Sequence, residues 1–379
     1  MSAIQFDNTV ELNALAYAIA AVGGKQTVLV EGDMGSGKTS LLKMLARMLP
    51  KHVPVYFDST TKDVGDMFVP MFDKIDEQGV VRYAVNEELG FHHGKPVILM
   101  LDELGKANPA VKNALLRIML ERETAGGNKL PEGSIVFATT NKGAEGVGDL
   151  LPPHARNRIT VVCMRKPDHK EWVEWGMASG IHPSVLGWVN ENPQLMQSFS
   201  DIKEPNGRTS TEEYQRHLDD ANPYIFHPKA KWRTAFVTPR SLEAVSNILW
   251  KSDEFDKQVL MQLMIGTIGE RGARDLMAFV NMANDLPKLQ EIKDNPDTAK
   301  VPESPAAQCM VVYRTLATIE YKWVANWMKY LNRLPKEVQG LFVNGARKET
   351  YVKRDVVSNC KEFGDWCLAN GYMYAQDKV

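Results

Sequence analysis

Short, nearly continuous runs of apolar residues alternate with helix-like patterns through residues 1–165. The runs that we predict as strands are TVLVEG, VPVYFD, PVILMLDE, GSIVFATTN and RITVVCM, at residues 27–32, 53–58, 96–103, 133–141 and 158–164. Between them, amphipathic patterns predict helices at about 38–49, 84–93 and 108–122. Strands that are apolar on both faces are typical of a parallel sheet covered by helices on both sides. The pattern therefore predicts an α/β core with a doubly wound parallel sheet.

After Pro167 the pattern changes to amphipathic helices that carry tryptophan. A polar stretch at about 198–235 is rich in Pro, Asn and Asp, and we predict that it is mostly loop. The residues that we expect to pack in the core or between subunits are Trp172, Trp175, Trp323 and Trp327. We predict three parts: the α/β core at 1–165, a helical domain with a polar insertion at 166–283, and a connector with a helical C-terminal extension at 284–379.

Composition and charge narrow the class of protein only slightly. Of the 379 residues, 44% are apolar and 24% charged, and the net charge is −2, so we expect a soluble globular protein without a global basic field. A local basic stripe is compatible with this total, and nucleic acid is not excluded as a partner. The four cysteines lack zinc-site spacing, the first residues lack a signal-peptide pattern, and no apolar run reaches the ~18 residues of a membrane span. We therefore expect a cytoplasmic protein with reduced thiols and no membrane contact.

The first motif that carries chemistry is GDMGSGKT, which follows the strand predicted at 27–32 and opens the next predicted helix. It matches G-x-x-x-x-G-K-[ST] in the strand–loop–helix setting that this motif requires. We expect its backbone N–H groups and Lys38 to bind the phosphates of ATP, and the Thr39 hydroxyl to bind Mg²⁺. The alternative is a glycine-rich turn with a chance Lys-Thr pair. The residues predicted to bind ATP are Gly32, Asp33, Met34, Gly35, Ser36, Gly37, Lys38, Thr39 and Ser40.

A second motif, VILMLDE at 97–103, ends a buried strand in two carboxylates. In a protein with this phosphate loop, Asp102 would hold Mg²⁺ through its water shell and Glu103 would polarise the attacking water. ATP and Mg²⁺ are thus the expected cofactors, and ATP hydrolysis is the expected reaction. Taken alone, the two carboxylates could be an acidic strand cap, but their order after the first motif favours the catalytic interpretation.

Three further motifs follow in a fixed order along the chain. FATTN ends a predicted strand with Asn141, LPPHARNRI supplies Arg156 and Arg158, and TPR opens a helix with Arg240. The ordered set resembles the AAA+ ATPases. The resemblance implies that Asn141 is sensor 1, which orients the water, and that Arg240 is sensor 2, which closes a helical lid over the nucleotide. It also implies an arginine finger that acts on the next subunit's nucleotide. The finger would be Arg158 or its neighbour Arg156, although either could instead be a surface arginine at the sheet.

Within AAA+, two segments resemble the hairpins of the MoxR-like ATPases. They lie at 65–91, before the DE motif, and at 121–134, before sensor 1. The resemblance covers about residues 20–280 and departs from the family in the polar insertion. It implies that 166–283 is the lid, that the protein forms a ring homo-oligomer, taken as a hexamer, and that its partner is a protein client such as one with a von Willebrand factor A domain.

The leading interpretation of function is a chaperone-like ATPase that remodels or matures a protein partner. The alternative is a nucleic-acid-directed AAA+ motor or helicase loader, whose hairpins should carry rows of Lys and Arg. The candidate hairpin instead mixes basic and acidic residues, which favours a protein client; they are Lys74, Arg82, Asp73, Asp76 and Glu77. A nucleotide-gated scaffold with little turnover is disfavoured by the second carboxylate of the DE motif.

Overall fold

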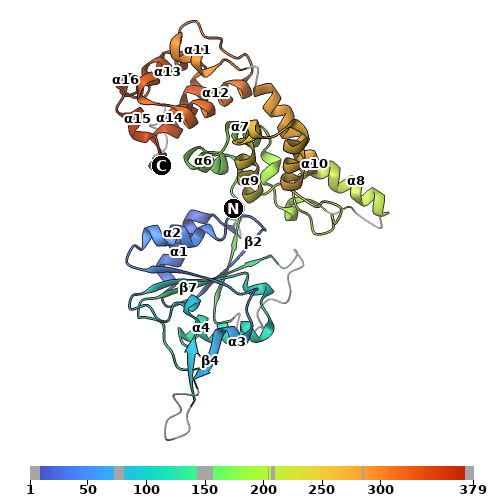
Figure 1. The fold of residues 1–379 in the computed structure, drawn as a ribbon, viewed down its shortest axis with the longest axis vertical. Coiled ribbons are helices and arrows are strands. Elements are labelled where there is room, and N and C mark those ends of the chain that lie inside the picture. Colours follow the sequence, from blue (N-terminus) through green and yellow to red (C-terminus); the bar gives the residue numbers. More distant parts are fainter. Residues whose placement is uncertain are drawn as a thin grey trace, which may run out of the picture. The chain divides into compact units, whose positions relative to one another are not determined.

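The chain forms two compact units (Figure 1), and each is described by itself. The first consists of Met1–Pro167 with His227–Lys229, and the second of Asp168–Phe226 with Ala230–Val379. The computed structural model describes residues 9–71, 81–124, 126–142, 157–203, 205, 210–283 and 286–371.

The first unit contains the predicted parallel sheet. In the described residues it has six strands in the order β1-β8-β2-β7-β6-β3, and each neighbouring pair is parallel. The strands are β1 Thr9–Val10, β2 Val28–Gly32, β3 Val53–Asp58, β6 Val97–Asp102, β7 Ile135–Asn141 and β8 Thr160–Met164. The five predicted strands are confirmed, each to within two residues at either end. The pattern does not predict β1, because a strand of two residues gives no periodic signal.

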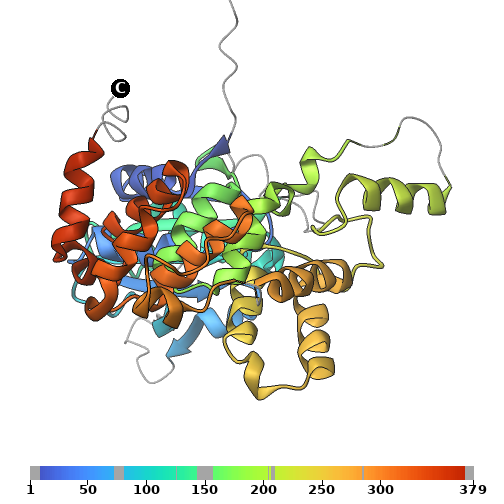
Figure 2. The same cartoon turned by 90° about the horizontal axis from the view of Figure 1, so that it is seen from above.

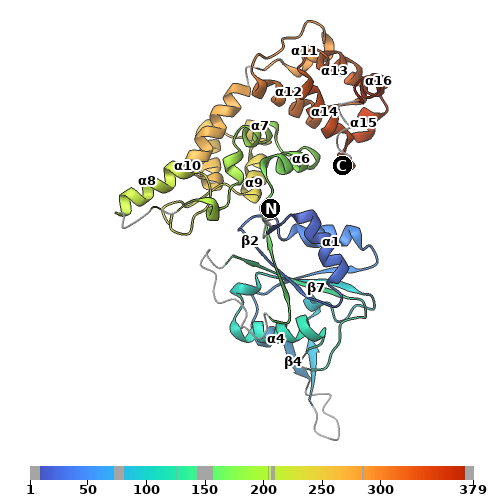
Figure 3. The same cartoon turned by 180° about the vertical axis from the view of Figure 1, so that it is seen from behind.

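Helices cover both faces of this sheet (Figures 1 and 3). The helices on one face are α1 Leu12–Val22 and α2 Ser40–Met48, and those on the other are α3 Val64–Met67 and α4 Pro109–Glu121. Along β6, Ile98 and Met100 pack into the core on the α1–α2 side, whereas Leu99 and Leu101 pack into the core on the α4 side. All four side chains are fully buried. Burial on alternate faces explains why the strand is one continuous apolar run.

The stretch at 84–93, predicted as a helix, folds differently. Only its first two residues belong to β5 Arg82–Val85, which pairs in an antiparallel hairpin with β4 Phe68–Met71, and a single 3-10 turn follows at Glu87–Leu89. The Asn86 side chain caps this turn, and the glycine that ends it has a φ of 77°. The helix prediction is wrong because the start of the stretch pairs across the hairpin, which is a long-range interaction, and the left-handed Gly90 ends the 3-10 turn after three residues.

Both segments that resemble MoxR-like hairpins contain antiparallel pairing. The β4–β5 hairpin lies within 65–91, and a bridge joins Glu123 to Lys129 within 121–134. Of the charged residues predicted for the first hairpin, those at 73–77 lie outside the described residues.

The second unit is built from helices around one hydrophobic core. They are α6 His169–Ser179, α7 Pro183–Glu191, α8 Thr211–Ala221, α9 Pro239–Leu249, α10 Lys257–Ala283, α11 Leu289–Asp294, α12 Pro305–Thr318, α13 Val324–Leu331, α14 Lys336–Arg347, α15 Arg354–Ser358 and α16 Lys361–Ala369. The core includes Trp172, Trp323 and Trp327, whereas Trp175 is 46% exposed. This unit holds both segments predicted as lid and extension, and their division near 284 stays a prediction. No described helix is long and apolar enough to cross a membrane.

The polar insertion at about 198–235, predicted as mostly loop, contains the helix α8. Ser210 forms a capping box with Glu213 at the start of α8, which a Ser-x-x-Glu pattern in the sequence already signals. At the other end, the Arg233 guanidinium donates to the backbone carbonyls of Leu218 at 3.1 Å and Asn222 at 2.9 Å. Most of the described insertion lies outside helices, as predicted, and α8 is the part that the prediction misses. Arg233 stabilises the end of α8, where backbone carbonyls lack helical partners.

The long helix α10 bends at Gly269, and Figure 2 shows its two segments meeting at an angle. Gly269 has φ 79° and ψ 163°, a conformation that is accessible to glycine and strained for other residues. A Cβ atom at this position would lie 2.6 Å from the Ala235 carbonyl oxygen. The bend therefore requires glycine.

We predict that Gly269→Ala lowers the free energy of unfolding by about 1–3 kcal/mol, because it adds backbone strain and a clash. Gly266→Ala in the same helix is the matched control, since a Cβ there meets nothing within 4 Å. It is expected to raise stability by about 0.5–1 kcal/mol. Chemical denaturation measures the change in the free energy of unfolding of each variant. Equal changes in the two variants would contradict the requirement for glycine at 269.

Candidate functional site

The carboxyl ends of the central strands bring the predicted motifs to one edge of the sheet. Gly32 at the end of β2 is the register partner of Asn141 at the end of β7, and Asp58 of β3 is the partner of Asp102 of β6. After β2 the chain crosses to β3, beyond β7 and β6, while β8 and β1 lie on the opposite side of β2. In open α/β sheets, ligands bind at such a reversal of strand order.

The loop from Gly32 to Thr39 has the backbone geometry of an anion cradle. Gly35 and Gly37 have φ angles of 69° and 94°, which glycine adopts without strain. The loop leads into the amino end of α2, where backbone N–H groups lack helical partners and favour an anion. Within the loop, the hydroxyl oxygen of Ser36 is buried and has no hydrogen-bond partner among the described residues. A buried hydroxyl of this kind fits a loop that closes around a polar ligand.

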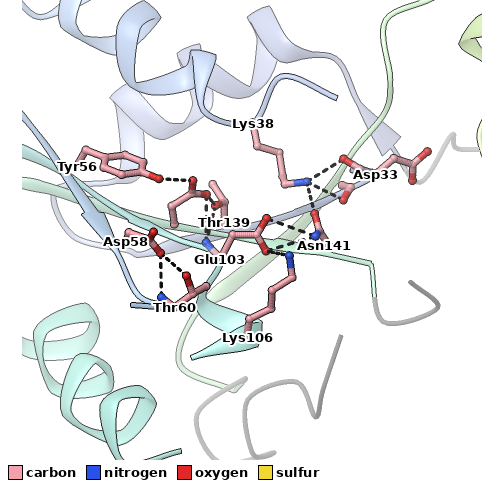
Figure 4. Close-up of polar contacts among 11 residues, drawn as sticks. Asp33, Lys38, Tyr56, Asp58, Thr60, Glu103, Lys106, Thr139 and Asn141 are labelled. Carbon is pink, nitrogen blue, oxygen red and sulfur yellow. Dashed lines mark hydrogen bonds and ion pairs between the residues drawn. The ribbon is translucent and has the colours of Figure 1, made fainter. Parts of the chain in front are cut away.

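Lys38 joins this loop to the end of β7 (Figure 4). Its side chain is buried, and Nζ donates to the backbone oxygens of Gly32 at 2.9 Å and Asp33 at 2.8 Å. It also donates to Oδ1 of Asn141 at 2.7 Å. Two residues that the sequence assigns to separate motifs, Lys38 and Asn141, are thus in direct contact.

Asn141 in turn contacts Glu103. Its Nδ2 lies 3.3 and 3.4 Å from the two carboxylate oxygens of Glu103, and Lys106 Nζ lies 2.9 Å from Oε2 of the same carboxylate. Glu103 has φ 52° and ψ 36°, in the left-handed region that is unfavourable for a residue other than glycine. Local strain of this kind often occurs at functional sites, where the surrounding contacts hold it in place.

Asp102 is buried and held by two side chains that the sequence motifs do not include. The hydroxyl of Thr139 donates to Oδ1, and the Tyr56 hydroxyl donates to Oδ2 at 3.0 Å. The Glu103 backbone N–H also donates to Oδ1, at 3.1 Å. Burial, and then the negative charge of Asp102, raises the pKa of Tyr56 to about 12, so this hydroxyl remains a donor across the physiological range. The alternation of side chains along a strand weakly indicates that both residues belong to the site. Thr139 lies on the same face of β7 as Asn141, and Tyr56 lies on the same face of β3 as Asp58.

The residues present fit Mg²⁺ as a ligand of this site. The hydroxyl of Thr39 makes no capping bond to its helix, and Asp102 supplies a carboxylate. Mg²⁺ prefers oxygen ligands and keeps several waters, so one or two protein groups together with phosphate oxygens can hold it. The described part of the chain contains no cluster of three or more His, Cys, Asp or Glu residues able to hold a metal.

The structure does not bring the predicted arginines into this cluster. Arg158 is exposed just before β8, and β8 begins at Thr160, the register partner of Val28 at the start of β2. The four steps of β8 span about 13 Å, so Arg158 lies at the opposite edge of the sheet from the phosphate loop. Its guanidinium makes no hydrogen bond or ion pair with any described residue. Arg156 lies outside the described residues.

Arg240 belongs to the second unit. It is the second residue of α9, exposed, and preceded by Thr238, which caps the helix through a capping box.

Comparisons with known proteins agree with this geometry. Residues 27–156, roughly a third of the chain, match the family model of the AAA domain (dynein-related subfamily). Together with the parallel sheet and the phosphate loop, this match defines the first unit as an AAA+ nucleotide-binding core, followed by helical regions.

Comparisons with individual proteins give no more specific assignment than this family match. No curated protein matches the chain. Among solved structures, NtrX from Brucella abortus in complex with ADP is 17% identical and covers 93% of this chain and 67% of its own, with a TM-score of 0.36. RuvB from Thermotoga maritima, a Holliday junction branch migration motor, is 13% identical and covers 72% and 68%, with a TM-score of 0.33. Scores of this size support no assignment of function.

We predict that Thr139→Val slows ATP hydrolysis about tenfold or more without weakening nucleotide binding, because Asp102 loses a charged hydrogen bond that fixes its orientation. The adjacent Thr140→Val is the matched control, because its side chain points to the opposite face of β7. Steady-state hydrolysis and ADP affinity separate the two effects. Equal hydrolysis rates in both variants would show that Thr139 does not position the carboxylate.

Proposed function

We propose that the protein is a cytoplasmic MoxR-like AAA+ ATPase, which couples ATP binding and hydrolysis in a ring homo-oligomer to the remodelling or maturation of a protein partner. The observation that carries the proposal is the continuous contact from Lys38 through Asn141 to Glu103. This contact connects the phosphate-binding loop to the carboxylate expected to act on water. A scaffold that only binds nucleotide does not require the contact between Asn141 and Glu103.

Each residue has a distinct proposed task in hydrolysis. Lys38 would exchange its protein oxygens for phosphate oxygens, and Thr39 and Asp102 would hold Mg²⁺, which supplies positive charge to the phosphates. Glu103 would accept hydrogen bonding from the attacking water and orient it, and Asn141 would fix Glu103 while sensing the terminal phosphate. In this proposal Arg240 acts as sensor 2, and 166–283 acts as the lid.

The position of Arg158 supports a site that is shared between subunits. An arginine at the opposite edge of the sheet does not reach the nucleotide of its own subunit, but its exposed side chain is available to a neighbouring copy. An arginine supplied in this way stabilises the charge of the transition state. We propose that Arg158 is this finger, with Arg156 as the alternative, and that the ring is a hexamer.

We predict that Arg158→Ala binds ATP normally but loses roughly 10³–10⁵ in hydrolysis rate. Glu103→Gln should also be inactive, because it lacks the group that orients water. When the two inactive variants are mixed, hydrolysis should return in part, since the Glu103→Gln subunit offers an intact Arg158 to the intact Glu103 of its neighbour.

The comparison for this experiment is each variant alone at the same total concentration. If the mixture stays inactive although the subunits assemble together, Arg158 does not act between subunits. Repeating the mixture with Arg156→Ala then tests the alternative finger.

The proposed partner is a protein, such as one with a von Willebrand factor A domain. The support comes from the hairpin β4–β5 between β3 and β6, which lies where MoxR-like ATPases have an insertion, and from the mixed charge of its sequence. In this proposal the hairpin passes motion of the core to the client. A nucleic-acid-directed motor is the second candidate, and the following experiment separates the two.

We predict that Glu103→Gln, loaded with ATP and Mg²⁺, retains a protein client in a pull-down, because ATP stays bound without being hydrolysed. Lys38→Ala is the matched control, since it removes the phosphate-binding ammonium and should retain no client under the same conditions. Mass spectrometry and nuclease treatment identify what is bound. Recovery of nucleic acid alone would contradict the chaperone-like function and favour the motor.

A further inference from the structure

A buried carboxylate lies within the phosphate loop itself. Asp33 directly follows Gly32, and its side chain is only 4% exposed. Lys142 Nζ lies 2.9 Å from Oδ1 of Asp33, and Lys166 Nζ lies 3.9 Å from Oδ2. Apart from these two ammonium groups, neither carboxylate oxygen of Asp33 has a hydrogen-bond partner among the described residues.

The sheet order fixes this group of three charges. β2 lies between β8 and β7, and Gly32 is the register partner of both Met164 and Asn141. Lys142 directly follows β7 and Lys166 follows β8 by two residues, so each neighbouring strand sends one lysine to the aspartate that follows β2. Both lysines are largely buried, with side chains 22% and 7% exposed.

A carboxylate in a loop that binds polyphosphate is unexpected on electrostatic grounds. Negative charges in a poorly solvated site repel each other strongly, and a carboxylate alone would weaken the binding of phosphate. The ammonium groups of Lys142 and Lys166 compensate the charge of Asp33, and an ammonium group is also a suitable partner for a phosphate. Lys38 shows the same arrangement, since its ammonium is held by oxygens of the protein beside the same loop.

We propose that Asp33 acts as an internal anion: it holds Lys142 and Lys166 beside the phosphate loop, and polyphosphate, when it binds, takes the place of Asp33 as a partner of the two lysines. The two lysines are then additional nucleotide-binding residues, and Asp33 lowers the affinity for nucleotide by competing for them. The proposal rests on the proposed function, because it assumes that the loop binds ATP and ADP. It differs from a purely structural ion cluster, in which the three side chains would contribute to stability alone.

Substitution of the aspartate gives the first test. Asp33→Asn keeps the shape and removes the competing charge, so the Kd for ADP with Mg²⁺ should fall about tenfold. The nucleotide-free variant should unfold at a lower temperature than the unsubstituted protein, because the ion pairs of Asp33 with the two lysines are lost, and the rise in Tm on adding ADP should be larger. A structural cluster predicts the loss of stability but an unchanged ADP affinity, and that result would overturn the proposal.

The lysines give an independent test if Asp33→Asn folds poorly. Lys142→Met leaves Asp33 less compensated, so the Kd for ADP should rise about tenfold, and Lys166→Met should act in the same direction. The matched control is Lys95→Met, because Lys95 is exposed just before β6, at the opposite edge of the sheet. An unchanged Kd in Lys142→Met, as in the control, would also overturn the proposal.

Lys38→Ala separates failure of this inference from failure of the proposed function. If Lys38→Ala binds ADP as tightly as the unsubstituted protein, the nucleotide site itself is wrongly placed and both proposals fail. If Lys38→Ala loses ADP while Asp33→Asn and Lys142→Met leave its Kd unchanged, the nucleotide site stands and only the exchange of lysines is refuted. Titration calorimetry with ADP and Mg²⁺ on the full chain measures all of these values.

Discussion

The parallel register of β2 with its two neighbours is the constraint on which the candidate site depends. It sets Gly32 beside Asn141 on one side and beside Met164 on the other, and the phosphate loop leaves the sheet at this point. Because side chains alternate along a strand, a shift of one residue would turn Asn141 and Thr139 to the other face. The contacts of Lys38 and Asp102 would then be lost together. Burial of both faces of the sheet makes such a shift costly, so the apolar core also protects the polar site.

A second property of the site is that its charges are compensated by the protein itself. The ammonium of Lys38 is held by three oxygens, and the carboxylate of Glu103 is held by Asn141 and Lys106. Binding of nucleotide at such a site is an exchange of partners, and only the difference between the two sets of contacts contributes to affinity. An exchange of this kind suits a protein that must release its product. In the proposed function, the contact that Lys38 and Glu103 share with Asn141 would also transmit the state of the nucleotide to Glu103.

The helical unit depends on a different kind of constraint. Its core is large and apolar, but single polar or glycine residues set the course of the chain at particular points. Arg233 binds the carbonyls at the end of α8, and Gly269 allows the bend in α10. Arg233 acts on α8 from outside that helix, whereas Gly269 lies within the helix that bends and packs against the Ala235 carbonyl.

The amino-acid sequence determined the strands of the sheet, the phosphate loop and the DE pair, because each depends on local patterns: continuous apolar runs, glycine spacing and the residue that ends a strand. It did not determine the hairpin strand at 82–85, which depends on a partner strand elsewhere in the chain. Nor did it identify Thr139 and Tyr56 as partners of Asp102, or place Lys142 and Lys166 on Asp33. Those contacts follow from the order of the strands, which only the tertiary structure decides, because periodicity records which faces of a strand are buried and not which strand lies next to it.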